Sequence, residues 1–207
     1  MQAANQPIFN ERGLMDATIP AEADIQRSMM ASDGQSLAEW MEARVARFSN
    51  RKYDWDALKF QADYDPTYRR AQMRYVGTGG TGVATDMNTV PSAHFTFSTM
   101  VIPAGNVGPS HIHYDVEEVF FVMRGKMKIV CEKDGQRWEA VLNERDLISV
   151  PPGVYREETN IGDEDALMCV MLGTPKPITP TYPPGSPLAK IKRDMLAAAE
   201  TQTLLKS

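Results

Sequence analysis

Hydrophobic and polar residues alternate along the middle of the chain in short runs that are typical of β-strands. Between residues 88 and 174 the pattern predicts strands at 93–103, 117–124, 126–132, 137–141, 146–150, 155–160 and 165–173. In the first run, the even-numbered residues from His94 to Met100 fall on one largely polar face. The pair Asp134-Gly135 is typical of a hairpin turn between two runs. Short strands at this spacing predict an all-β barrel or sandwich.

Segments with helical periodicity flank the predicted strands. Ser36 and Glu39 are spaced as in a capping box, and the apolar residues from Leu37 to Phe48 recur at helical spacing. We expect this helix to bury one stripe of side chains, and a shorter helix at 21–31 to precede it. At the other end of the chain, residues 188–200 predict an amphipathic helix.

The segments next to the strands carry further signals. The aromatic residues between Tyr53 and Tyr68 predict packing over a face of the barrel or at its mouth. Residues 69–76 predict a further strand, whose arginines we expect to be solvated: Arg69, Arg70 and Arg74. If one of them pointed inward instead, it would favour an anionic substrate.

These patterns divide the chain into three parts. Residues 1–87 form an N-terminal arm, helices and a first strand that packs on the barrel, and residues 88–174 form the barrel core. Residues 175–207 form a proline-rich strap, which we expect to run extended across the outside of the barrel, and a C-terminal helix.

Composition limits the classes of protein that fit. The chain has 207 residues, of which 43% are hydrophobic and 24% charged, as in one domain with a full core plus extensions. It has no apolar run long enough to span a membrane and no secretory leader, so we expect a cytoplasmic protein without a membrane partner. The net charge of −5 and the scattered basic residues argue against binding to nucleic acid. Cys131 and Cys169 lie in apolar runs and predict buried thiols.

One stretch carries most of the candidate chemistry. His111 and His113 are separated by one residue, so both imidazoles leave the same face of an extended backbone. Glu118 follows at a distance that allows a turn to bring its carboxylate back beside the imidazoles. Two imidazoles and one carboxylate suit a first-row divalent ion and leave positions open for substrate or dioxygen. We predict one divalent metal ion here: Fe(II) first, with Mn(II), Ni(II) and Zn(II) as alternatives.

The same stretch resembles the first motif of the cupin superfamily, Gly-x5-His-x-His-x4-Glu-x6-Gly. All five positions are filled, by Gly105, His111, His113, Glu118 and Gly125. The resemblance implies a single-domain cupin: a double-stranded β-helix, or jelly-roll, barrel, here with helical extensions at both ends.

The second cupin motif, Gly-x5-Pro-x-Gly-x2-His-x3-Asn, is matched only in part. Pro151, Gly153 and Asn160 fit, but Arg145 stands in place of the first glycine. Arg156 stands in place of the histidine that is the fourth metal ligand of the family. Because a guanidinium offers no lone pair, Arg156 cannot bind a metal ion.

Three interpretations of Arg156 remain open. It projects into the pocket and binds a substrate carboxylate or oxyanion beside a three-ligand centre, it pairs with Glu118 in a metal-free barrel, or a register shift places it outside. We predict the first, with the metal retained and Arg156 as the substrate-binding residue. Glu158 shares the face of Arg156 in an extended strand, where it is an ion-pair partner or a replacement ligand.

Two further residues are candidates for the site. His94 could be a third imidazole ligand or a hydrogen-bond donor to a ligand, or it could be a histidine at a strand entrance bonded to nearby backbone. Glu117, like Glu158, could complete the coordination.

The resemblance leaves the activity open, because cupins include dioxygenases, decarboxylases, isomerases, lyases and proteins that only bind ligands. We expect a metal-dependent enzyme that acts on a small anionic or enolisable metabolite, aromatic ones included, and we predict dioxygenase-type oxidoreductase chemistry. The alternatives are an isomerase or lyase with a glutamate as base, and a regulatory binding protein with a degenerate metal site. The long extensions and the exposed edges of a small barrel favour a homodimer.

Overall fold

The computed structural model describes residues 34–204, apart from 82–85, 87 and 92–93. The chain divides into two compact units, Met1–Val45 and Ala46–Ser207. The arm at the start of the chain and the helix predicted at 21–31 lie outside the described residues. A division at residues 87 and 174 stays a prediction.

The first unit contains α2 (Leu37–Glu42), which begins at the predicted capping box. The Glu39 N–H donates to Ser36 Oγ at 3.3 Å, and the Ser36 N–H donates to Glu39 Oε2 at 2.9 Å. The prediction of a longer helix with a buried stripe is wrong, because α2 ends at Glu42 and none of its residues is buried. A helix this short gains little from backbone hydrogen bonds alone. Phe48 begins a separate 3-10 turn, η1 (Phe48–Asn50).

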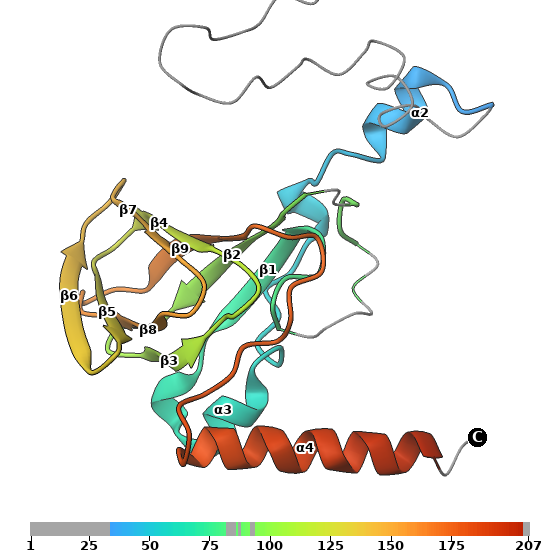
Figure 1. Cartoon of the computed structure of the whole chain (residues 1–207). Coiled ribbons are helices and arrows are strands. Elements are labelled where there is room, and N and C mark those ends of the chain that lie inside the picture. Colours follow the sequence, from blue (N-terminus) through green and yellow to red (C-terminus); the bar gives the residue numbers. More distant parts are fainter. Residues whose placement is uncertain (1–33, 82–85, 87, 92–93, 205–207) are drawn as a thin grey trace, which may run out of the picture. The chain divides into compact units, whose positions relative to one another are not determined.

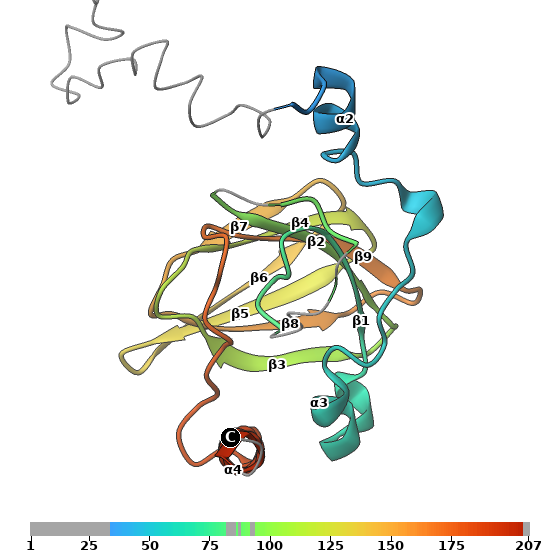
Figure 2. The same ribbon diagram turned by 90° about the vertical axis from the view of Figure 1, so that its right-hand side faces the viewer.

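The strands described in the second unit form two antiparallel sheets that face each other (Figures 1 and 2). The first sheet has the order β1 (Ala71–Val76), β2 (Thr96–Ile102), β9 (Ala166–Leu172), β4 (Glu118–Arg124), β7 (Leu147–Val150). The second has the order β3 (Val107–Ile112), β8 (Tyr155–Asn160), β5 (Met127–Lys133), β6 (Gln136–Leu142). The predicted all-β jelly-roll barrel with helical extensions is thereby confirmed.

The predicted strands are all present at nearly the predicted ranges, but β3 was missing from that set. Its first residues, Val107-Gly108-Pro109-Ser110, lack an alternating apolar pattern. The pairing of β3 with β8 also shifts register between Gly108 and His111, as at a β-bulge. Pairing with β8, rather than local sequence preference, therefore makes this segment a strand.

The hydrophobic core fills one end of the space between the sheets. There Ile102 of β2 pairs with Ala166 of β9, and the core cluster includes Phe120, Val122, Met127, Ile129 and Met168. At the other end of the same two strands, Thr96 pairs with Leu172. That end carries polar side chains and holds the candidate site.

The helix α3 (Lys59–Tyr64) and the strap line one side of this site. α3 and η2 (Pro66–Tyr68) precede β1, and α4 (Pro187–Leu204) ends the described chain. As predicted, the strap crosses the barrel: Thr181 and Ile112 of β3 exchange backbone hydrogen bonds at 2.8 and 2.9 Å. The Tyr182 ring meets Phe60 of α3 edge to face, with 6.2 Å between ring centres. No helix of the described residues is long and apolar enough to cross a membrane.

Candidate metal centre

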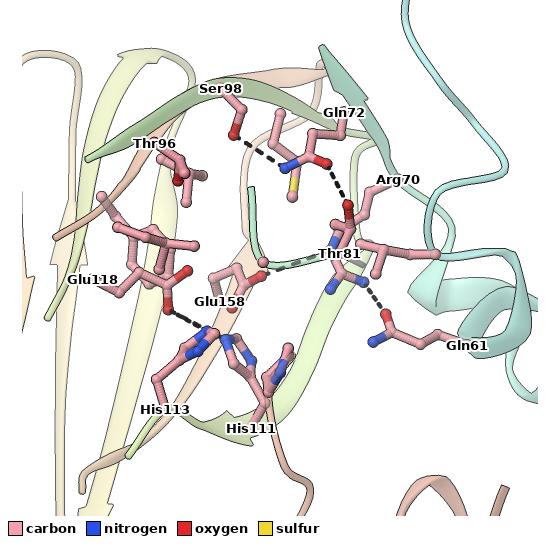
Figure 3. Close-up of a pocket in the computed structure, with 17 residues that line it drawn as sticks. Gln61, Arg70, Gln72, Thr81, Thr96, Ser98, His111, His113, Glu118 and Glu158 are labelled. Atoms are coloured by element: carbon pink, nitrogen blue, oxygen red, sulfur yellow. Dashed lines mark hydrogen bonds and ion pairs between the residues drawn. The ribbon is translucent and has the colours of Figure 1, made fainter. Parts of the chain in front are cut away.

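Three side chains of the first motif converge inside the barrel. His111 lies near the end of β3, His113 lies just beyond it, and Glu118 begins β4. All three are buried, with exposed fractions of 7%, 3% and 5%. The Nε2 atoms of His111 and His113 lie 3.3 and 3.7 Å from Glu118 Oε2 (Figure 3). The three candidate ligand atoms are within 4.8 Å of one another, so this group could hold a metal ion.

The backbone around the histidines sets their orientation. His111 Nδ1 lies 3.0 Å from Pro109 O, and because a carbonyl only accepts, Nδ1 carries the hydrogen. A neutral His111 therefore presents the Nε2 lone pair to Glu118 Oε2, which is also an acceptor. Two facing acceptors need a cation between them, which is either a shared proton or a metal ion. The donor set thus fits a divalent ion.

The second motif supports this geometry through Gly153. Its N–H donates to His113 O at 2.8 Å, which holds the loop after β3 in place. Gly153 has φ of 78°, a conformation that favours glycine. The motif glycine therefore has a structural role beside the site.

The pKa values follow from burial and from the Glu118 charge. Burial lowers the pKa of His111, but the hydrogen bond and charge of Glu118 outweigh burial and raise it overall. Burial lowers the pKa of His113 to about 4, so its imidazole is neutral at neutral pH. Burial raises the pKa of Glu118, but the His111 hydrogen bond and the neighbouring positive charges lower it overall. Metal ions bind neutral imidazoles and ionised carboxylates, so the pKa shifts of His113 and Glu118 favour metal binding. The raised pKa of His111 favours its protonated form without metal, and a metal ion would have to displace that proton.

Arg156 lies inside the barrel next to Glu118, so the interpretation that places it outside is wrong. Its side chain is 0% exposed, and the Arg156 strand position pairs with His111 of β3. Nη2 donates to Pro151 O at 3.1 Å, and Nε forms an ion pair with Glu118 Oε2 at 3.6 Å, which is too long for a good hydrogen bond. The pairing with Glu118 that the second interpretation expected is therefore present. Nε and Nη1 are buried without a hydrogen-bond partner among the described residues.

The trio borders a cavity of about 50 Å³, which is lined by side chains of both sheets, α3 and the strap (Figure 3). Apart from the trio, its polar and charged lining residues are Gln61, Arg70, Gln72, Thr81, Thr96, Ser98 and Glu158. Its apolar wall includes Leu58, Met100, Phe120, Val170 and Leu172. The predicted polar face of β2 does point inward, since Thr96, Ser98 and Met100 all line the cavity.

The other predicted site residues are distributed differently. His94 is exposed and precedes β2, and it does not line the cavity. Glu117 is exposed and accepts a hydrogen bond from the Ser149 hydroxyl. Glu158 is 2% exposed and lines the cavity, whereas Arg156 does not line it. A substrate contact by Arg156 stays a prediction.

The guanidinium that does line the cavity belongs to Arg70, which we expected to be solvated. Arg70 and Arg74 are only 5% and 6% exposed, so the expectation is wrong for both, while Arg69 is exposed. The sequence contained one signal of this arrangement, because Arg70, Gln72 and Arg74 alternate with apolar residues and share one face of a strand. Gln61 on α3 had no comparable signal.

Comparison with known proteins locates the family match in the barrel. Residues 98–172 match the family model described as Cupin domain, and no curated protein matches the chain. An oxalate oxidase structure is 21% identical with a TM-score of 0.39, and the match covers 40% of this chain and 43% of that chain. The Lactobacillus farciminis oxalate decarboxylase, in a formate complex, is 14% identical with a TM-score of 0.48 and coverages of 66% and 34%. A Schizosaccharomyces pombe cupin domain is 16% identical with a TM-score of 0.40 and coverages of 51% and 61%.

The chain spans less than half the length of the oxalate oxidase and oxalate decarboxylase chains that it matches. At these identities the likeness concerns the fold alone. The family match begins within β2 and covers all of β3 to β9, the part of the chain that carries the trio and both motifs. Residues 98–172 of this chain are therefore a cupin domain, as the motifs predicted.

Proposed function

We propose that the cavity is the active site of a metal-dependent enzyme that oxidises a small anionic metabolite with dioxygen. The observation that supports this proposal is the convergence of the buried side chains of His111, His113 and Glu118 on one wall of a cavity, with their ligand atoms within 4.8 Å of one another. Two imidazoles and one carboxylate with open positions are the ligand set of many non-haem Fe(II) oxygenases, so Fe(II) is the ion that we propose first. Mn(II), Ni(II) and Zn(II) are the alternatives. A bound ion would supply a Lewis acid and a centre for dioxygen activation.

The residues of the chain itself would orient the ligands and exclude water. The Pro109 carbonyl fixes the His111 ring through Nδ1, and the Arg156 charge favours the ionised form of Glu118. Phe120, Val170 and Leu172 provide an apolar wall that limits the access of water. These contacts pre-organise the ligand set before substrate enters.

The volume of the cavity limits the size of the substrate. An engineered cavity that takes up benzene measures about 150 Å³, whereas this cavity measures about 50 Å³. The space therefore favours a small aliphatic metabolite over the aromatic substrates that the sequence left open.

A second candidate function is an isomerase or lyase, and the position of the Glu158 carboxylate at the cavity favours it. Its carboxylate lines the cavity, and Oε2 is buried without a hydrogen-bond partner among the described residues. Burial raises the pKa of Glu158, although the Arg70 charge opposes this effect. A buried carboxylate with a raised pKa suits proton transfer to and from a bound substrate.

Dioxygen consumption separates the two candidates. The full chain is loaded with Fe(II) under anaerobic conditions and mixed with small carboxylic acids in an oxygen-electrode cell, beside His113→Ala and the exposed-surface control Glu132→Ala. We expect substrate-dependent dioxygen uptake that the control retains and His113→Ala loses. Consumption of an acid without dioxygen uptake would favour the isomerase or lyase. If the iron-loaded protein consumes neither an acid nor dioxygen, the proposal is contradicted.

The homodimer expected from the sequence is also kept as a proposal. Light scattering of the full chain in solution should give twice the chain mass. A mass equal to one chain would contradict it.

A further inference from the structure

We infer that the wall of the cavity built around Arg70 is a carboxylate-binding subsite, so that the ligand of this site is a small carboxylic acid. In Figure 3 this wall lies across the cavity from Glu118. The inference deepens the proposed function and rests on it for the metal, but the residues that carry it are separate from the metal ligands.

Arg70 has hydrogen-bond donors to spare. Its Nη1 donates to Gln61 Oε1 at 2.7 Å and to Tyr68 O at 3.1 Å, which fixes the position of the guanidinium. Its Nε is buried without a hydrogen-bond partner among the described residues. A guanidinium has five N–H groups in a planar fork that matches a carboxylate, and a buried donor without a partner is unfavourable. An oxygen of a bound carboxylate would satisfy it.

Glu158 does not take up this donor, although it is the nearest carboxylate. The distance from Arg70 Nε to Glu158 Oε1 is 3.7 Å, which is an ion pair but not a hydrogen bond, and Oε2 has no partner among the described residues. The Glu158 carboxylate lies so close to β3 that a Cβ on Gly108 would be 1.7 Å from Oε1. The carboxylate is therefore held against the β3 backbone, and the contact with Arg70 stays open.

The polar groups beside Arg70 are already held in place. Gln72 Nε2 donates to Ser98 Oγ at 3.1 Å, and Gln72 Oε1 accepts from Thr81 Oγ1 at 3.0 Å and from Arg74 Nη1 at 3.2 Å. The Ser98 hydroxyl accepts from Gln72 and has no acceptor for its own O–H among the described residues, so it can donate to a ligand. Side chains fixed before binding lose little conformational entropy when the ligand arrives.

The charge of the cavity favours an anion once the metal is bound. The charged side chains that line it, besides the histidines, are Arg70, Glu118 and Glu158, which leave one excess negative charge. A divalent cation reverses this to one excess positive charge, and Arg156 behind Glu118 adds a second. Carboxylate binding and metal binding should therefore strengthen each other.

The volume selects small acids. About 50 Å³ holds only a few non-hydrogen atoms, so the smallest acids, with one or two carbons, are favoured. One carboxylate would contact Arg70, and a second oxygen of the acid would face the metal ligands.

The test measures binding rather than turnover. The full chain and two variants, Arg70→Gln and Arg69→Gln, are loaded with Co(II), and cobalt per chain is determined. Two small acids, glycolate and glyoxylate, are then titrated by calorimetry and by the visible absorption of Co(II). Arg69 is the matched control, because it is the exposed neighbour whose guanidinium stacks on Trp55. Arg70→Lys, which keeps the charge, and a thermal melt of each protein separate loss of the subsite from misfolding.

We expect the wild type and Arg69→Gln to bind at least one of the two acids, and Arg70→Gln to keep its cobalt while its affinity falls at least about tenfold. Equal affinities in Arg70→Gln and the wild type would overturn the subsite and leave the metal centre standing. Loss of cobalt from a folded Arg70→Gln would also overturn it, because Arg70 would then act through the metal. If the wild type takes up no cobalt, the metal proposal fails, and the same acids are titrated into the metal-free protein. Acid binding that depends on Arg70 would then support the subsite, and absence of acid binding would overturn the subsite as well.

Discussion

Gly108 provides the space for the Glu158 carboxylate, and Gly108→Ala tests this contact. A Cβ at this position would lie 1.7 Å from Glu158 Oε1, 2.1 Å from its Cδ and 2.8 Å from its Cγ. Side-chain atoms do not approach this closely, so one of the two groups must move. The carboxylate is the flexible end of a side chain and will move first, which disturbs its ion pair with Arg70.

The structure sets the size of the expected loss. Glu158 and Arg70 are 2% and 5% exposed, and removal of one partner from such a buried ion pair costs about 3–5 kcal/mol. Because the two groups are 3.7 Å apart and share no hydrogen bond, we expect Gly108→Ala to lower the free energy of unfolding by less, about 2–3 kcal/mol. This is a large part of the total for a domain, about 5–15 kcal/mol.

Urea unfolding of the full chain measures the loss at a constant m value. Gly173→Ala is the matched control, because a Cβ there meets its nearest atoms at 3.7 and 3.8 Å; we expect a change within about 0.5 kcal/mol. In the double variant Gly108→Ala/Glu158→Ala the clash is gone, so its loss should equal that of Glu158→Ala alone. The reasoning would be refuted if the loss in the double variant equalled the sum of the losses in the two single variants. It would also be refuted if Gly108→Ala were as stable as the wild type.

Three other substitutions test separate parts of the molecule. Asn160→Ala should lower the free energy of unfolding by about 2–4 kcal/mol in the same assay, because the buried amide makes three hydrogen bonds to the backbone at 2.8, 2.8 and 2.9 Å; a loss under about 1 kcal/mol would contradict this. Asp54→Asn should destabilise the protein at pH 7 but not at low pH. Burial raises the pKa of Asp54, but the hydrogen bond from Arg74 lowers it overall, below its ordinary value of 3.8. The stabilisation by the ionised carboxylate is therefore lost as the pH falls through this lowered pKa. Unfolding midpoints at both pH values check this, and equal losses would count against it. Arg156→His should tighten Co(II) binding about tenfold or more in chelator competition, because it removes a buried positive charge and adds an imidazole; unchanged affinity would argue against the position of Arg156 beside the centre.

The trio could be predicted from sequence because spacing alone constrains it. Two side chains that are two residues apart share a face of any extended backbone, and the turn before Glu118 needs only a few residues. By contrast, the inward position of Arg156 could not be decided, because it depends on the register between β8 and β3, which shifts next to His111. One residue of slip would have moved the guanidinium to the other face.

The polar wall around Arg70 could not be predicted in full, because tertiary contacts assemble it. Gln61 bonds to Tyr182, which is 121 residues away, and only the packing of α3 against the strap brings them together. The prediction of a buried helical stripe after Ser36 was wrong for the opposite reason, because it relied on a local pattern alone. In the described structure none of the residues of α2 is buried, and the helix ends after six residues. Local patterns therefore predicted strands and the trio well, and long-range contacts decided the rest.

The most direct test of the central claim is metal per chain, measured by elemental analysis of untagged protein prepared without chelator and then loaded with Fe(II), Mn(II), Ni(II) or Zn(II). We expect about one ion per chain in the wild type and in Glu117→Ala, whose carboxylate is exposed, and almost none in His111→Ala or Glu118→Ala. Negligible metal in the wild type after loading, or undiminished metal in Glu118→Ala, would contradict a metal centre at His111, His113 and Glu118.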